Sequence, residues 1–528
     1  MWGLRSTRTL VIAAATVVFV VCCVLPLASM LAGTFSGRTS VGSTYAALLL
    51  DPRQRRLLFN TALLGIMTAT FATVIGAPLG VALARLELRG KAILRVLLAA
   101  PMLLPPVVVG LAWISLGGDT GLLTQLAGRD LLSTWTHTMS GAVLVLTLVL
   151  YPVSMLATEV AVRRIEPRLE EAALIVARPG RVVWHITLGL AAPSITAAAL
   201  VIFVLAASDF GVPGLLRVRV YTTEVFTAFA ALYDFGRGAV LTLPLLVIST
   251  LVAAAAVALA GERLITTRRA MSGRHPPLFD PWKPAAVAAA SAMVLLALVL
   301  PLAALVREVQ GVRSWAEVVA GSGIAIRNSL VLAAVGATLT VAVGLGLGYA
   351  RARARGTVGI IADLACVVLF AVPSTVVGVG LIGLWNRPGV LGTVYGTDAM
   401  LVLVCLARFL PLAVLGLAAA VRHVPYSHEE AAAAAGAGWA RTISTIVVPQ
   451  MSASLVAVWV VVFVLAFGEL GASILVAPPG EATLPIRIYT MIANAPPANV
   501  AALALLQSVV ILSPLTLLAW GLTLREAR

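Results

Sequence analysis

A chain of 528 residues that is 60% hydrophobic and 11% charged cannot cover its apolar side chains in water, because soluble domains usually carry about 25% charged residues. The net charge of +15 does not indicate nucleic-acid binding, since the basic residues lie in short segments between apolar runs and do not gather on one polar face. A membrane span needs about 20 apolar residues. We therefore predict an all-α polytopic membrane protein without a large soluble domain.

The apolar runs predict about twelve transmembrane helices in two sets of six. The first set occupies residues 10–31, 57–83, 93–116, 139–162, 195–210 and 240–259. The second set occupies residues 285–306, 326–349, 360–385, 399–421, 453–476 and 500–522. A polar, Arg-rich segment lies between the sets. We therefore predict a first unit at 1–262, a cytoplasmic linker at 263–284 and a second unit at 285–528.

The first apolar run could also be the core of a signal peptide, because Arg5 and Arg8 precede it. Its apolar core is longer than the roughly 7–15 residues that are usual in signal peptides. It also has a counterpart in the second set, because Val-Leu-Pro-Leu-Ala at 24–28 recurs at 299–303. We therefore expect an uncleaved membrane anchor that forms part of a repeat.

Further sequence echoes occur in the same order in both sets. The matching pairs are Asn60-Thr61 with Asn328-Ser329, Pro105 with Pro373, Val108-Val109-Gly110 with Val376-Val377-Gly378, and Pro152 with Pro411. Because each set has an even number of spans, both copies enter the membrane in the same orientation. The chain is therefore predicted to be a parallel tandem repeat of two six-helix permease-like units.

The Lys and Arg residues that flank the spans predict that both termini are cytoplasmic. With this orientation the cytoplasmic segments carry Arg85, Arg89, Lys91, Arg95, Arg163, Arg164, Arg168, Arg178, Arg181, Arg263, Arg268, Arg269, Arg274, Arg351, Arg353 and Arg355. The opposite side is poorer in basic residues by roughly two to one. Arg53, Arg55 and Arg56 disagree with this orientation, because they would lie outside.

One cytoplasmic loop in each unit is longer than the others, at about 30 residues. The loop in the second unit contains Glu430, Ala431, Ala432, Gly436, Ile446 and Pro449. The Ala-rich sequence after Glu429 and Glu430 favours a short helix with acidic residues near its positive end. Gly436 can take a positive φ and turn the chain. Pro449 ends a second amphipathic stretch that starts at Trp439.

This pattern resembles the EAA loop of ATP-binding cassette importer permeases, which reads Glu-Ala-Ala, three residues, Gly, nine residues, Ile, two residues and Pro. The segment from Glu430 to Pro449 fits that spacing at every marked position. The resemblance covers nearly the whole chain, as two fused permease units. It implies that each loop seats in a cytoplasmic ATPase subunit, with two copies in all, and that an extracytoplasmic solute-binding protein delivers the solute.

The first copy of the loop departs from the pattern. It keeps Glu171-Ala172-Ala173, but Ala177 occupies the position of the turn glycine, and Gly180 follows three residues later. We expect a register shift of one residue in this copy. Glu171, Ala172, Ala173 and Gly180 remain its candidate ATPase-coupling residues.

No phosphate-binding loop of the form Gly-x-x-x-x-Gly-Lys-Ser/Thr occurs in the sequence. We therefore expect that the chain is not an enzyme, that it binds no cofactor and that a partner subunit hydrolyses ATP. Cys22, Cys23, Cys366 and Cys405 lie in apolar runs and are interpreted as small buried side chains. His423 and His428 are five residues apart and would not share a helical face, so no metal site is predicted.

Two acidic residues and one arginine are candidates for the translocation pathway. Asp209 follows the fifth span and Glu469 follows the eleventh, and carboxylates at membrane depth usually face a cavity or a partner. The alternative is that both acids only hold helices together, by capping or by pairing with Arg. Arg408 lies deep in the tenth span. It should have a partner there, either Glu469 or a neighbouring carbonyl.

Four sequence phrases resemble the fused permeases of ferric-iron importers. They are Tyr-Gly-Thr at 395–397, Arg-Phe-Leu-Pro at 408–411, Pro-Pro-Gly at 478–480 and Thr-Leu-Pro-Ile-Arg-Ile-Tyr at 483–489. Thiamine, aminophosphonate and polyamine permeases share several of these phrases, and Gly-Glu-Leu-Gly at 468–471 resembles sulfate and molybdate permeases. Ferric iron is the expected solute, with these other solutes as alternatives.

Two other classes of protein fit the sequence less well. Major-facilitator secondary transporters also have twelve spans in two parallel halves, but the paired cytoplasmic loops would have no use without an ATPase. The spans also contain no chain of ionisable residues for a proton relay. A membrane-embedded enzyme would need clustered Asp, Glu, His or Cys near one interface, and the sequence has no such cluster.

Overall fold

The computed structural model describes residues 2–35, 51–88, 90–118, 121, 124, 135–230, 235–260, 280–310, 315–354 and 356–526. The regular elements in these ranges are all helices, with no strand among them. The predicted all-α class is therefore confirmed. Residues 263–279 of the predicted linker lie outside the described residues.

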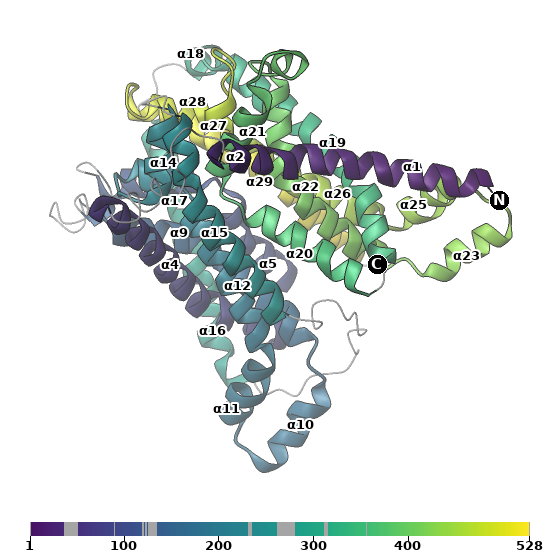
Figure 1. The fold of residues 1–528 in the computed structure, drawn as a ribbon. Helices are drawn as coiled ribbons and strands as arrows, with labels where there is room; N and C mark the ends of the chain where they lie inside the picture. The colour runs from purple at the N-terminus through teal and green to yellow at the C-terminus, as the bar shows by residue number, and fades with distance from the viewer. Residues whose placement is uncertain are drawn as a thin grey trace. The chain divides into compact units, whose positions relative to one another are not determined.

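The helices of the two repeats follow one another along the chain in a similar order (Figure 1). In the first repeat they are α1 (Trp2–Phe19), η1 (Val20–Val24), α2 (Leu25–Phe35), α4 (Pro52–Arg85), α5 (Lys91–Ala99), η2 (Ala100–Leu103), α6 (Pro106–Gly117), α9 (Met139–Arg163), α10 (Pro167–Val176), α11 (Pro179–Val182), η3 (Val183–Thr187), α12 (Leu188–Ser208), α13 (Gly211–Leu215), α14 (Tyr221–Ala230) and α15 (Phe235–Ala260). In the second repeat they are η5 (Asp280–Trp282), α16 (Lys283–Val294), η6 (Leu295–Val299), α17 (Leu300–Val309), α18 (Trp315–Ala320), α19 (Gly323–Arg353), α20 (Thr357–Ala371), α21 (Ser374–Trp385), η7 (Val390–Thr393), α22 (Ala399–Arg422), α23 (Tyr426–Ala434), α24 (Trp439–Thr442), η8 (Ile443–Val447), α25 (Val448–Gln450), α26 (Ser452–Phe467), α27 (Ser473–Val476), α28 (Leu484–Met491) and α29 (Pro497–Glu526).

The helices agree with the predicted membrane spans in number. Within the described ranges, nine helices are long and apolar enough to cross a membrane, and three bent pairs raise the possible total to twelve. The fifth span differs in extent, because one helical stretch runs over Pro179–Ser208 where the sequence predicted only 195–210. Its polar start made the first part look like a loop, although the helix continues through it.

The predicted span 453–476 is interrupted, because α26 ends at Phe467 and α27 begins at Ser473. Two other predicted spans, 93–116 and 360–385, are not continuous helices either. The chain bends by 92° between Lys91–Leu103 and Pro106–Gly117, and by 96° between Thr357–Ala371 and Ser374–Trp385. Pro105 and Pro373 stand at these breaks with ψ values of 129° and 140°, outside the helical region. Proline lacks the N–H that would continue the helix and its ring clashes with the preceding turn. The structure therefore corrects both runs to bent helix pairs.

The compact units of the structure are not the two sequence halves. Compact unit 1 consists of Met1–Leu49, Val225–Thr250 and Val319–Thr490, and compact unit 2 consists of Leu50–Glu224, Leu251–Val318 and Met491–Arg528. Within unit 1, α1 packs on α19 and α2 packs on α21; within unit 2, α17 packs on α6 and α29. Each unit thus combines the central spans of one repeat with the first span and all or most of the last span of the other. The boundaries of the duplication itself remain a prediction.

Glycine pairs bring the second and fourth spans of each repeat into close contact. Where α4 packs along α9, a Cβ atom at Gly76 or Gly80 would lie 2.5 or 2.4 Å from a backbone oxygen of α9. Gly344 and Gly348 take the equivalent positions where α19 packs along α22. Small residues four apart commonly allow such close packing in membranes. This Gly-x-x-x-Gly spacing stands in the sequence at both places but was not used in the predictions above.

The matching pairs at the start of the second span, Asn60-Thr61 and Asn328-Ser329, have the same structural role in both repeats. The backbone N–H of Tyr221 donates to Thr61 Oγ1 over 2.8 Å, and that of Leu484 donates to Ser329 Oγ over 2.6 Å. Each hydroxyl therefore fixes the segment that follows the fifth span of its repeat. A hydroxyl residue is needed at both positions for this contact, which explains why Thr and Ser match one another.

Candidate functional site

The loop after the tenth span forms a helix–turn–helix that we call the second elbow, made of α23, α24, η8 and α25. It lies at one end of compact unit 1 (Figure 1). Helix α23 ends at Ala434, and Gly436 then takes a φ of +81°, which residues other than glycine rarely adopt. The N–H of Gly436 donates to the carbonyl of Ala433 over 3.0 Å. The turn predicted at Gly436 is therefore present.

The residues of the Glu-Ala-Ala pattern divide between two faces of the second elbow. Glu430, Ala431, Gly436 and Pro449 are exposed, Ile446 is half-buried and Ala432 is buried. The exposed set forms a surface that a partner can reach, whereas Ala432 faces the bundle. These positions fit the predicted coupling role of the six residues, which stays a prediction.

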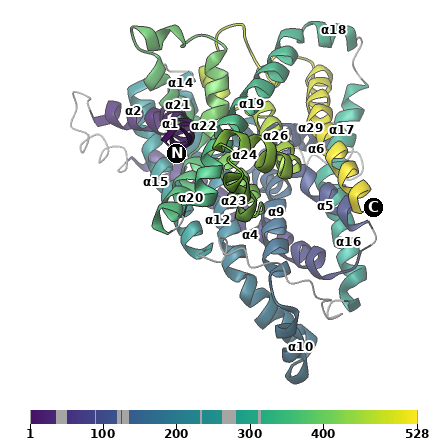
Figure 2. The same cartoon turned by 90° about the vertical axis from the view of Figure 1, so that its right-hand side faces the viewer.

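The corresponding first elbow is made of α10, α11 and η3. It lies at one end of compact unit 2 in two perpendicular views (Figures 1 and 2). Its turn is at Ala177, which has extended backbone at φ −136° and ψ 152°. Gly180 lies in the first turn of α11 and has no positive φ. The turn therefore does not use Gly180, because an extended residue before Pro179 redirects the chain without a left-handed conformation.

The two elbows present different side chains on their exposed faces. Glu171 and Ala172 of the first elbow are exposed and Ala173 is half-buried. Ile175 and Val176 at the end of α10 are 85% and 86% exposed, whereas the second elbow has alanines in the same places. The first elbow thus offers the larger apolar surface. The sequence shows the difference in residue type but not the exposure of these side chains, because exposure depends on how each elbow projects from its bundle.

A buried carboxylate stands directly before the exposed glutamate of each elbow. Glu170 forms an ion pair with Arg85, with 2.8 Å between Oε1 and Nη2, and both side chains are fully buried. Glu429 forms an ion pair with Arg353 and accepts a 2.7 Å hydrogen bond from Tyr349 Oη. These contacts were not predicted. The signal for them was the double acid, Glu-Glu, at 170–171 and 429–430.

The two intramembrane acids cap short turns that follow their spans. Asp209 Oδ1 accepts the backbone N–H of Val212 over 2.8 Å. Glu469 accepts the backbone N–H groups of Ala472 and Ser473, each over 2.9 Å, and also the hydroxyl of Ser473. These are the contacts expected from the capping alternative. A role of Asp209 and Glu469 in lining the pathway remains a prediction.

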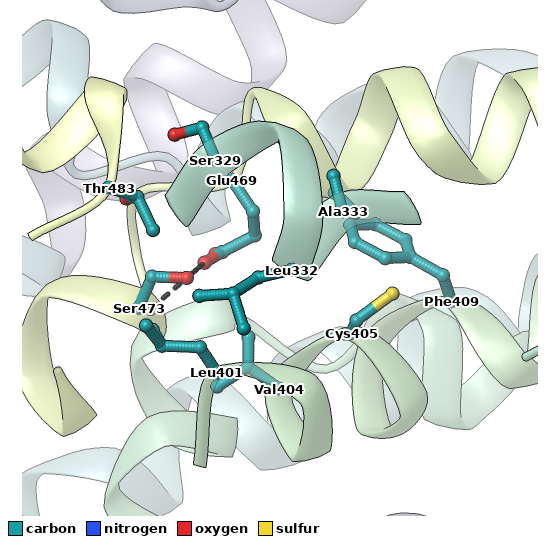
Figure 3. Close-up of a pocket in the computed structure, with 11 residues that line it drawn as sticks. Ser329, Leu332, Ala333, Leu401, Val404, Cys405, Phe409, Glu469, Ser473 and Thr483 are labelled. Carbon is teal, nitrogen blue, oxygen red and sulfur yellow. Dashed lines mark hydrogen bonds between the residues drawn. The ribbon is translucent and has the colours of Figure 1, made fainter. Parts of the chain in front are cut away.

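Glu469 also lines a small cavity within compact unit 1 (Figure 3). The cavity lies between α19, α22 and the segment after α26, and Ser329, Val404, Cys405 and Phe409 contribute to its wall. Figure 3 shows the Glu469 carboxylate turned toward Ser473, with the hydrogen bond drawn between them. The carboxylate is therefore held by its own turn, in a cavity whose wall combines the polar side chains of Ser329, Ser473 and Thr483 with apolar ones.

Arg408 has a backbone carbonyl as its partner. Its Nη1 donates to the carbonyl oxygen of Val372 over 2.6 Å, and within the described ranges no ion pair joins it to Glu469. Val372 ends α20 directly before the break at Pro373. A carbonyl at such a break has no helical donor, and in a membrane it must find another one. Arg408 supplies this donor, so it fixes the bend in the ninth span.

Replacing Arg408 by methionine is expected to destabilise the protein by about 1–3 kcal/mol, because the Val372 carbonyl loses a buried hydrogen bond from a charged donor. The measurement is the midpoint of thermal unfolding in detergent. Arg387→Met is the matched control, because Arg387 is exposed and donates to the carbonyl of Gly383 over 3.0 Å. Equal midpoints for the two variants would contradict the assigned role of Arg408.

The four cysteines are all free and buried. Cys22, Cys23 and Cys366 belong to one apolar cluster with Leu410. The interpretation of the cysteines as small buried side chains is confirmed by this packing. Burial explains why the four cysteines lie in apolar runs and requires no chemical role for them.

The sequence profile of the family described as "Binding-protein-dependent transport system inner membrane component" matches residues 76–263 and again residues 320–522. Two matches of this extent cover most of the chain. The chain belongs to this family. It is a fused permease of the ATP-binding cassette importer type and a multi-pass inner-membrane protein, with one family domain in each repeat, as the paired elbows indicated.

Relatives of this permease include proteins that are similar to it over most of its length. The Fe(3+)-transport system permease protein FbpB 2 of Haemophilus influenzae is 23% identical over 470 residues, or 85% of this chain and 87% of the relative. A putative ferric transport system permease protein, FbpB 1, of the same organism is 22% identical over 86% of this chain and 74% of the relative. The molybdenum transport system permease protein ModB of Escherichia coli is 30% identical over 169 residues, which are 31% of this chain and 72% of the relative.

Proposed function

We propose that this permease is the membrane subunit of an importer for ferric iron. The observation that carries the proposal is its similarity to a Fe(3+)-transport permease over 85% of the chain, which includes both repeats. The molybdenum permeases are similar over only about a third of the chain. Ferric iron would be the cargo of the complex and would not be a resident cofactor of this chain.

Two cytoplasmic ATPase subunits and an extracytoplasmic solute-binding protein complete the proposed importer. The support for the ATPase subunits is the pair of elbows, because each carries an exposed glutamate, Glu171 or Glu430, on a short helix outside the spans. The ATPase would dock on the cytoplasmic side, because the basic residues that flank the spans predict that the elbows and both termini are cytoplasmic. The chain itself then hydrolyses no ATP and holds no cofactor.

The test uses an affinity-tagged permease purified from its native membranes, with its bound proteins identified by mass spectrometry. The complex is then reconstituted in liposomes with the copurified binding protein. We expect an ATPase subunit to copurify and radiolabelled ferric iron to enter only with ATP and the binding protein present. Glu430→Lys reverses an exposed charge on α23 and is the docking-defective control.

Competition separates the proposed solute from its alternatives. Excess molybdate or thiamine is expected to leave ferric-iron uptake unchanged. ATP-dependent uptake of molybdate in place of iron would support the importer class but contradict ferric iron as the solute. Molybdate is the second candidate because of the 30% identity to ModB. Uptake without any ATPase subunit would contradict the importer and favour a secondary transporter.

A further inference from the structure

The exposed surface of each elbow can contact a partner, but a buried ion pair joins the elbow to the membrane bundle. In the first elbow, Glu170 Oε1 accepts hydrogen bonds from Arg85 Nη2 over 2.8 Å, from Arg85 Nε over 3.2 Å and from Thr187 Oγ1 over 2.8 Å. The side chains of Arg85 and Glu170 are both 0% exposed. Three donors on one oxygen hold α10 at a fixed position relative to the end of α4.

The second elbow has the same linkage with different supporting groups. Arg353 pairs with Glu429 and also donates to the carbonyl oxygen of Val424 over 3.1 Å. Its guanidinium carbon lies 5.2 Å from the centre of the Tyr426 ring. The pair is slightly open to solvent, with side chains 14% and 8% exposed. Helix α23 is thus tied to the end of α19, as α10 is tied to the end of α4.

The two linkages occupy equivalent positions in the repeats. Arg85 is the last residue of α4 and Arg353 is the last residue of α19, which are the second spans of the two repeats. Glu170 and Glu429 both lie in the first turn of the elbow helix. The same pair therefore occurs twice in one chain, although the supporting residues, Thr187 and Tyr349, differ.

The spans at the other end of the linkage are rigidly packed. Helices α4 and α19 lie against the fourth spans of their repeats through the glycine pairs described above. A force on an elbow therefore reaches a helix that cannot yield locally, because close-packed helices move as units and do not deform continuously. The exposed Glu171 and Glu430 can touch a partner, whereas the buried Glu170 and Glu429 cannot.

We propose that Arg85–Glu170 and Arg353–Glu429 are positioning residues that transmit movement of the ATPase subunits from each elbow to the second span of its repeat. The proposal rests on the importer function proposed above. Two different residues of each elbow then have two different roles. The exposed glutamate contacts the ATPase, and the buried glutamate transmits the movement of the ATPase to the span. Loss of a pair should therefore uncouple transport from ATP hydrolysis while the ATPase stays bound.

The test replaces the first pair by two apolar residues in Arg85→Met/Glu170→Met. Removing one partner alone would leave a buried charge uncompensated, whereas replacing both by apolar side chains is commonly tolerated in folded proteins. The readouts are the amount of copurified ATPase subunit and the number of ATP molecules hydrolysed per ferric ion imported in liposomes. We expect normal copurification and about a tenfold rise in ATP used per ion, which corresponds to the upper part of known coupling effects.

Two further variants keep the test decisive. Thr187→Val removes one hydrogen bond to Glu170 and little volume, and should raise the ATP used per ion by about two- to fivefold. Glu171→Gln changes the exposed neighbour of Glu170 and should weaken copurification of the ATPase without changing that ratio in the complexes that form. If the double variant does not fold, Thr187→Val carries the test.

The outcomes separate this proposal from the proposed function. A wild-type ratio of ATP to imported ion in both Arg85→Met/Glu170→Met and Thr187→Val would overturn the transmission role and leave the pair as a structural contact. Loss of copurified ATPase in the double variant would overturn it too, because the pair would then shape the docking surface. Absence of ATPase from the wild-type complex would instead refute the importer itself.

Discussion

Replacing Gly80 by leucine is expected to abolish the folded permease. A Cβ atom at this position would lie 2.4 Å from the carbonyl oxygen of Met155 and 2.7 Å from Cβ of Thr158. Neither neighbour is the flexible end of a side chain, so α4 and α9 would have to separate. Overpacking of a well-packed interior costs about 1–3 kcal/mol and more where backbone must move. That is a large part of a typical stability of about 5–15 kcal/mol.

The measurement is the yield of monodisperse permease after extraction in detergent, together with its thermal midpoint. Gly189→Leu is the matched control, because a Cβ atom at Gly189 meets nothing within 4 Å. Gly344→Leu should have an intermediate effect, since its nearest neighbour is the Cβ atom of Ala413 at 3.2 Å. Equal yields for Gly80→Leu and Gly189→Leu would show that the contact between α4 and α9 does not limit folding.

Replacing Gly436 by proline is expected to remove ferric-iron uptake while the membrane bundle stays folded. Gly436 has a φ of +81°, whereas proline fixes φ near −65° and has no N–H to donate. The hydrogen bond to the carbonyl of Ala433 would be lost with the turn. Helix α24 would then leave α23 in another direction, and the second elbow could not fit its ATPase subunit. We expect uptake to fall by more than about tenfold, since a mismatch of this kind costs about 3 kcal/mol or more.

The control series at Gly436 separates backbone conformation from side-chain size. Asparagine tolerates the left-handed region better than other residues, so Gly436→Asn should keep most of the uptake. Gly436→Ala should lie between asparagine and proline. A Cβ atom at this position meets nothing within 4 Å, so the order cannot come from a clash. Full uptake by Gly436→Pro, or loss of monodisperse protein, would contradict the predicted local effect.

The difference between the two elbows bears on how these variants should be interpreted. The second elbow turns at a left-handed glycine, and the first turns at extended backbone before Pro179. A backbone substitution at Gly180 should therefore be far milder than one at Gly436, although both were candidates from the sequence. The buried ion pair, in contrast, is common to both elbows, so it is the feature that the duplication kept.

The number and rough position of the spans, the duplication and the turn at Gly436 could all be predicted from the amino-acid sequence alone. A membrane span can be recognised from about 20 consecutive apolar residues, because these residues must be apolar whichever helices pack against them. The helix after Glu430 and the turn at Gly436 are local in the same way, because they follow from consecutive residues. The predicted stop at Pro449 is wrong, because the helical stretch from Trp439 runs through Pro449 and ends at Gln450.

A proline in the sequence does not by itself predict whether a helix bends there. Pro78, Pro152, Pro193, Pro244, Pro411 and Pro514 lie inside continuous helices. Pro105 and Pro373 instead stand at bends of 92° and 96°. At Pro373, Arg408 satisfies the carbonyl at the break from another helix. Such a donor is remote in the chain, so no local pattern predicts it.

The contacts between helices and between buried charges depend on three-dimensional packing and could not be predicted. Arg85 and Glu170 are 85 positions apart, and the first span of each repeat packs in the compact unit of the other. Hydropathy shows that a helix has an apolar surface but does not identify the neighbour that covers it, because many neighbours bury the same area. The helix that packs there is determined by close contacts at glycine and by buried ion pairs. Both depend on residues that are distant in the sequence.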